Sequence, residues 1–137
     1  MPNSFFMNLN IIQPSQLYIS EVKLESVKSW FSPSEIENYE PLPIKELDGV
    51  IFFTDGHTRA LATYLSGNKV AKVYWDEDEL DWNVYRESIK WCVDKGITTI
   101  EDLSDRIITR DEYKKLWLDR CQEMQDKLKA ERELIKS

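Results

Sequence analysis

Alternating polar and apolar positions predict short β-strands in the first part of the chain. Residues 8–12 alternate in this way and are expected to form the first strand. Two apolar runs, 42–47 and 50–54, flank Asp48-Gly49, a pair typical of the tight turn in a β-hairpin. A further strand is expected over residues 70–75.

Apolar residues at helical spacing predict helices between and after these strands. One helix is expected over residues 21–31, with Ser20 as its N-cap and Pro33 beyond its end. A second is expected over 57–66, closed by Gly67. After residue 80 the pattern is helical throughout, with helices expected over residues 80–95, 100–103 and from about 110 onward.

The last of these helices has a defined start and one apolar face. Thr109 and Glu112 have the spacing of a capping box. The apolar face comprises Tyr113, Leu116, Trp117, Cys121 and Met124. We therefore expect an α+β fold, with a core over residues 1–76 and a C-terminal helical extension over 77–137 that packs on it. Roughly the last 12 residues are mostly charged, and we expect them to fray or to pack on a protein partner.

Composition fits one compact domain. The chain has 137 residues, of which 42% are hydrophobic and 12% aromatic, which argues against intrinsic disorder. The tryptophan and tyrosine side chains after residue 74 have helical spacing, which favours packing of the extension onto the sheet over stacking on an adenine base. The formal net charge of -7 disfavours binding to DNA or to an anionic membrane.

Cysteine and histidine usage argues against a structural metal site. Cys92 and Cys121 lack metal-ligand spacing, and one histidine cannot complete a zinc site with them, so we expect both thiols to be small core residues. The N-terminus lacks the features of a secretory signal, and no apolar run is long enough to span a bilayer. A reducing, cytoplasmic location is expected.

The turn over residues 55–59, between a predicted strand and a predicted helix, carries the best candidate chemistry. Gly56 allows the backbone to approach a ligand closely, and the helix N-terminus favours an anion. Arg59 can grip a phosphate through two hydrogen bonds, and His57 or Thr58 can add another. Asp55 can hold Mg²⁺ or orient the loop. The alternative is an ordinary helix start, with Asp55 as its N-cap and Arg59 in a surface ion pair.

Three motifs make residues 9–75 similar to the ParB/sulfiredoxin superfamily of nucleotide-binding domains. They are Gln13-Pro14-Ser15-Gln16, Glu40-Pro41-Leu42-Pro43-Ile44 and Asp55-Gly56-His57-Thr58-Arg59. The last resembles the Asp-Gly-His-His-Arg turn of the free-serine kinase branch. It differs from the Gly-Cys-His-Arg of sulfiredoxins, which carries their reactive cysteine, and from the Gly-Glu-Arg-Arg of ParB. The resemblance implies that the turn and Gln16 bind the phosphates of ATP or ADP, with Mg²⁺ as companion.

One departure from the kinase branch bears on catalysis. Two positions after the proline, that branch carries a glutamate that acts as general base, and here the residue is Gln16. An amide cannot accept a proton at neutral pH, and general-base help is typically worth about 10²–10⁴-fold in rate. Glu21 or Glu25 on the following helix are possible substitutes.

Two functions therefore remain open. The first is a nucleotide-binding domain that acts as a Mg²⁺-dependent phosphotransferase or nucleotide hydrolase, with Asp55 and His57 as candidate catalytic residues. The second is a non-catalytic module that recognises a nucleotide or a phosphorylated partner. A nucleic-acid accessory role is a third alternative, although acidic residues among Arg106, Arg110, Lys114 and Lys115 make direct DNA binding by the C-terminal helices unfavourable.

Overall fold

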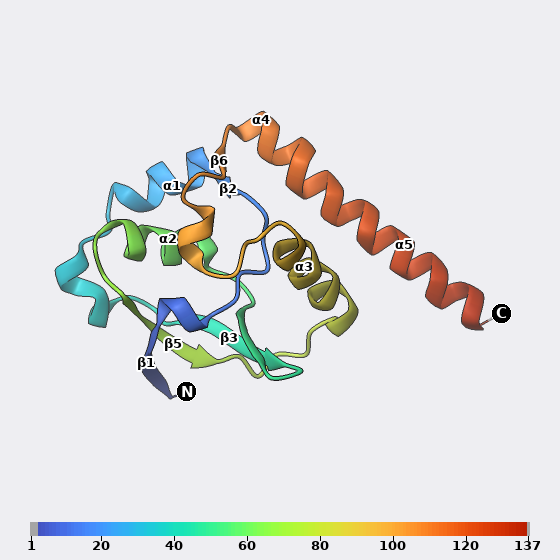
Figure 1. The fold of residues 1–137 in the computed structure, drawn as a ribbon, viewed down its shortest axis with the longest axis horizontal. Coiled ribbons are helices and arrows are strands. Elements are labelled where there is room, and N and C mark those ends of the chain that lie inside the picture. Colours follow the sequence, from blue (N-terminus) through green and yellow to red (C-terminus); the bar gives the residue numbers. More distant parts are fainter. Residues whose placement is uncertain (1–2, 137) are drawn as a thin grey trace.

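The computed structural model describes residues 3–136 and has an α+β fold, as the sequence predicts (Figure 1). A four-stranded mixed sheet has the order β1-β5-β3-β4. In this sheet β3 pairs in parallel with β5, and the other two pairs are antiparallel. The strands are β1 (Ser4–Asn8), β3 (Leu42–Leu47), β4 (Val50–Phe53) and β5 (Val70–Trp75). The predicted hairpin and the predicted strand over 70–75 are confirmed.

Helices pack around this sheet, and a second, two-stranded sheet joins the two parts of the chain. The helices are α1 (Glu21–Lys28), α2 (His57–Leu65), α3 (Trp82–Asp94), α4 (Arg110–Tyr113) and α5 (Asp119–Lys136). A π-helical turn, Lys114–Leu118, joins α4 to α5, and the predicted capping box of Thr109 and Glu112 begins α4. The short strands β2 (Ile19–Ser20) and β6 (Ile107–Ile108) pair in parallel.

Two predicted boundaries were wrong. Residues 8–12 are not a strand, because β1 ends at Asn8 and Leu9–Ile11 form a 3-10 turn. The Asn8 side chain accepts the Asn10 N–H at 2.8 Å, which turns the chain and buries both Leu9 and Ile12. The predicted helix over 21–31 ends at Lys28, and a further 3-10 segment, Pro33–Asn38, follows.

The core lies between the sheet and the helices α1 and α2, which lie together on one side of the sheet in Figure 1. Ala71 and Val73 of β5 are buried, whereas Lys72 and Tyr74 alternate with them and are half-buried. On the side of β4, Phe52 packs against Tyr85 of α3, with their rings 5.5 Å apart. Residues on both sides of the boundary expected at residue 76 share this core, since Ile97, Ile100 and Leu103 belong to it.

Polar contacts also cross that boundary. The Gln13 side chain donates to the Ile97 carbonyl at 2.7 Å, and the Arg106 guanidinium donates to the Leu17 carbonyl at 2.7 Å. The loop before α1 is thus fixed by the segment between α3 and α4. Within residues 3–136, no helix is both long enough and apolar enough to cross a bilayer.

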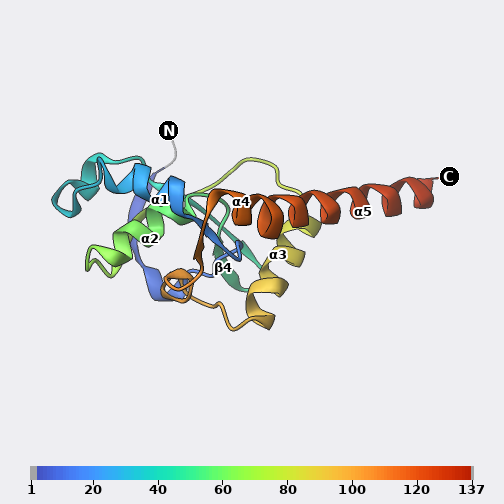
Figure 2. The ribbon, with the colours of Figure 1, turned by 90° about the horizontal axis from the view of Figure 1, so that it is seen from above.

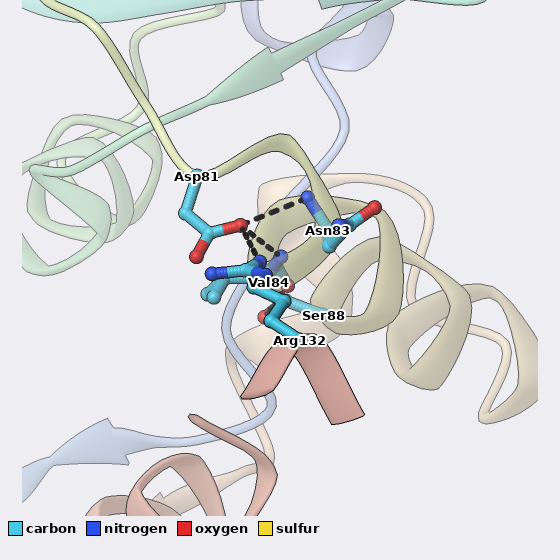
Figure 3. Close-up of polar contacts among 5 residues, drawn as sticks. All are labelled: Asp81, Asn83, Val84, Ser88 and Arg132. Atoms are coloured by element: carbon cyan, nitrogen blue, oxygen red, sulfur yellow. Dashed lines mark hydrogen bonds and ion pairs between the residues drawn. The ribbon is translucent and has the colours of Figure 1, made fainter. Parts of the chain in front are cut away.

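The helix α5 runs past α3, and its last turns extend beyond the rest of the molecule (Figures 1 and 2). Trp91 of α3 packs edge-on against Trp117, with ring centroids 6.0 Å apart. Further along, Arg132 of α5 donates to Asp81 at 2.8 Å, and the same carboxylate caps α3 by accepting the N–H groups of Asn83 and Val84 (Figure 3). One side chain therefore both begins α3 and holds the distal part of α5.

Candidate functional site

The turn predicted as a binding site joins β4 to α2. Gly56 is the N-cap of α2 and has the left-handed conformation, with φ at +78°. A Cβ atom there would lie 2.8 Å from Cδ2 of Leu42, so both the backbone and the space favour glycine. The alternative with Asp55 as N-cap was wrong, because Gly56 holds that position and the Asp55 carboxylate accepts the adjacent Gly56 N–H at 2.8 Å.

The first turn of α2 presents backbone N–H groups without acceptors. The first bond within the helix runs from the Ala60 N–H to the Gly56 carbonyl at 2.9 Å. The N–H groups of His57, Thr58 and Arg59 precede it, and the part of the chain that is described offers them no acceptor. These three donors lie at the positive end of the helix dipole, which is an arrangement that binds anions.

His57 is buried in this turn, with 4% of its surface exposed. Its Nε2 accepts the Ser15 N–H at 2.9 Å, while the Ser15 hydroxyl donates to the Phe53 carbonyl at 2.7 Å. Since an N–H group can only donate, Nε2 carries no proton, and in the neutral ring Nδ1 must carry it. Nδ1 is buried and has no hydrogen-bond partner among the described residues.

Burial keeps this imidazole neutral. Desolvation lowers the pKa of His57 from 6.5 to about 4, and the nearby Asp55 carboxylate offsets this only in part. At neutral pH the ring is therefore a neutral donor through Nδ1. An unpartnered buried donor costs about 1–3 kcal/mol, which reduces the stability of the folded turn.

Arg59 is held beside the turn without an ion pair. Its guanidinium donates to the Glu40 carbonyl at 2.9 Å. The alternative of a surface ion pair was wrong, because no carboxylate within residues 3–136 lies within ion-pair distance of Arg59. Its positive charge thus remains available to an anionic ligand.

Gln16 lies near the same turn but is held by two other residues. Its amide nitrogen donates to the Tyr18 carbonyl at 2.8 Å and to the Tyr113 hydroxyl at 3.0 Å. Tyr113 comes from α4, and Lys23 of α1 lies over its ring, with Nζ 5.1 Å from the centroid. The side chain of Gln16 is therefore fixed by the C-terminal extension.

An open pocket of about 540 Å³ brings all of the predicted site residues together. The sequence predicted six of its residues, namely Gln16, Asp55, Gly56, His57, Thr58 and Arg59. It did not predict the other five, which come from α1 and α4: Val22, Lys23, Ser26, Val27 and Tyr113. The basic residue in the first turn of α1 was a usable signal, whereas Tyr113 was assigned only to an apolar helix face.

The pocket has limited means for proton transfer or metal binding. Asp55 is the single carboxylate among its described lining residues, and Glu21 and Glu25 do not line it. No cluster of three or more metal-ligating side chains occurs in the described chain. Any Mg²⁺ bound here would take most of its ligands from phosphate and water. The catalytic roles of Asp55 and His57 stay predictions.

Comparison with known proteins gives a fold likeness only. No protein-family model and no curated protein matches the chain. The crystal structure of protein Atu1540 from Agrobacterium tumefaciens is similar, with a TM-score of 0.52 and 12% sequence identity. The match covers 75% of this chain and 62% of the other, so this chain corresponds to less than two thirds of that protein.

Proposed function

We propose that this protein is a nucleotide-binding domain of ParB/sulfiredoxin type, whose pocket at the start of α2 takes the phosphates of ATP or ADP. The start of α2 carries the proposal, because three N–H groups without an acceptor among the described residues lie there beside the Arg59 guanidinium, which has no ion-pair partner in that part of the chain. A phosphate oxygen is a suitable acceptor.

The surrounding charges support an anionic ligand. Three N–H groups of the first turn of α2, together with Arg59 and Lys23, make this pocket rich in donors on a chain with a net charge of -7. A volume of about 540 Å³ lies in the range for a ligand of nucleotide size. The three motifs within residues 9–75 resemble those of the superfamily. Residues of these motifs either line the same pocket or support it.

Two observations favour binding without catalysis. The amide of Gln16 is engaged with Tyr18 and Tyr113, and an amide is no base. Nε2 of His57 is engaged with Ser15, so its lone pair is not free to accept a substrate proton. Mg²⁺ would then accompany the nucleotide as a charge-neutralising ion, with Asp55 as the single carboxylate among the described lining residues.

A thermal-shift panel tests the proposal. ATP, ADP, AMP, phosphoserine and a short DNA duplex would be compared, each with and without Mg²⁺. A ligand that binds only the native state raises the apparent free energy of unfolding by about 2.7 kcal/mol when its concentration is a hundredfold above Kd. We expect ATP or ADP to raise Tm in the wild type and not in Arg59→Gln.

Arg86→Gln serves as the matched control. Arg86 is an exposed arginine on α3 whose ion pair with Asp48 spans 3.7 Å, and it does not line the pocket. If none of these ligands raises the Tm of the wild-type protein, the proposal of nucleotide binding is refuted. A shift with phosphoserine alone would favour a phosphorylated protein partner, and salt-dependent binding to DNA would favour the nucleic-acid alternative.

A further inference from the structure

The C-terminal extension contributes a wall of the pocket. Tyr113 lies in α4, well outside the segment that resembles the nucleotide-binding superfamily, yet it lines the pocket together with the start of α2. It is 6% exposed and fixed by the bond from Gln16. The pocket is therefore incomplete without residues beyond 110.

The hydroxyl of Tyr113 has a hydrogen to spare. The amide nitrogen of Gln16 uses its two hydrogens for Tyr18 and Tyr113, so the Tyr113 oxygen acts there as acceptor. The described chain provides no acceptor for the phenol hydrogen. Burial raises the pKa of Tyr113 to about 12, which keeps this hydrogen in place at neutral pH.

Lys23 adds a positive charge at the same wall. Its ammonium lies over the Tyr113 ring at 5.1 Å from the centroid, and no carboxylate in the described chain pairs with it. Lys28, on the same helix, is instead 3.8 Å from Glu25 and does not line the pocket. The two lysines of α1 thus differ in both partner and position.

We infer that Tyr113 and Lys23 form a second anion-binding arm, so that the ligand carries at least two phosphoryl groups. This inference rests on the proposed function. The N–H groups of α2 with Arg59 hold one phosphoryl group, and the phenol O–H with the Lys23 ammonium holds the next. Nucleoside di- and triphosphates fit this requirement, and a monophosphate reaches one arm only.

Calorimetric titration of the full chain with ADP and AMP, in excess Mg²⁺, tests the inference. We expect the wild type to bind ADP at least about tenfold more tightly than AMP. One additional charge-assisted hydrogen bond to the second phosphoryl group is sufficient for a difference of this size. Tyr113→Phe and Lys23→Met should each weaken ADP binding about tenfold and bring its affinity close to that for AMP. Lys23→Arg should restore the preference for ADP.

Two substitutions of the same chemistry serve as controls. Tyr85→Phe removes a hydroxyl that donates to the Thr54 carbonyl at 3.0 Å outside the pocket, and Lys28→Met removes the other lysine of α1. Both should bind ADP within about twofold of the wild type. Circular dichroism and melting would establish that each variant is folded.

The possible outcomes separate the inference from the proposed function. If Arg59→Gln loses ADP binding while Tyr113→Phe and Lys23→Met keep it, the second arm is refuted and nucleotide binding stands. Equal affinity of the wild type for ADP and AMP refutes the second arm as well. If the wild type binds neither nucleotide, both the proposed function and the inference fail.

Discussion

The Ser15 N–H donates to Nε2 of His57 across 2.9 Å, and this bond joins two segments that are 42 residues apart. It fixes the ring tautomer and directs the remaining proton to Nδ1. It also places the loop that contains Gln16 beside the first turn of α2. His57 therefore holds two segments of the pocket together, and its catalytic role stays a prediction.

The buried His57 predicts a loss of stability in mild acid. Above its ordinary pKa of 6.5 the ring is neutral in both states, so it contributes no pH dependence. Between 6.5 and about 4 the unfolded chain binds a proton that the folded protein excludes, and the free energy of unfolding falls. Below about 4 the loss levels off, at roughly 3 kcal/mol in total.

Urea unfolding of the wild type and His57→Gln between pH 7 and pH 4 measures this contribution. Glutamine can accept the Ser15 N–H and does not titrate, whereas carboxylates affect both proteins alike. We expect the wild type to lose about 3 kcal/mol more than His57→Gln over this range. Parallel curves for the two proteins would contradict the burial of a neutral ring.

Gly56 should be less replaceable than another glycine of the same backbone conformation. Gly67 has φ at +94° and open space around its Cα, whereas a Cβ at Gly56 meets the buried Leu42. Each change to alanine costs about 1–2 kcal/mol for the left-handed backbone. Gly56→Ala should cost more than Gly67→Ala by chemical denaturation and should also weaken nucleotide binding. Equal losses with unchanged binding would mean that Leu42 moves aside freely.

The Asp81 carboxylate should have two separable roles. Arg132→Gln and Asp81→Asn both remove the ion pair but keep an acceptor for the cap of α3. We therefore expect both variants to show faster amide exchange over residues 126–136 and little change in Tm. Asp81→Ala also removes the cap and should cost about 1 kcal/mol more. Hydrogen exchange with mass spectrometry and thermal melting measure the two effects. If Arg132→Gln leaves exchange unchanged, other contacts hold α5.

Gln16→Glu tests whether the pocket is an inactivated kinase site. A carboxylate cannot donate to the Tyr18 carbonyl, so we expect the variant to be less stable than the wild type. We also expect no phosphate transfer from ATP to free serine, with Gln125→Glu, at an exposed position outside the pocket lining, as a comparison of equal charge. Serine phosphorylation that appears only in Gln16→Glu would favour the catalytic alternative over a binding module.

The sequence predicted those parts of the fold that local chemistry determines. Asp48-Gly49 specified the hairpin, and Thr109 with Glu112 specified the start of α4. It did not predict the 3-10 turn after Asn8, because one side-chain bond to Asn10 outweighed a period-two pattern. The β2–β6 pair was also missed, since each strand has two residues and leaves no periodic signal.

The candidate site was predictable where its residues are consecutive and not where they are distant. The turn over residues 55–59 combined a glycine, a histidine and an arginine, so its location in the pocket was expected. The role of Tyr113 depends on a bond to Gln16 across 97 positions, and its apolar spacing on a helix indicated only packing. The neutral state of His57 depends on burial, which no neighbouring residue encodes.

The parallel pairing of Ile19 with Ile107 sets the order in which the molecule can be completed. During translation, all four strands of the larger sheet precede residue 76, whereas β2 and Tyr113 gain their partners only after the segment from 107 to 113 has left the ribosome. A chain that ends before residue 107 therefore lacks both the β2–β6 pair and the wall of the pocket that Tyr113 forms.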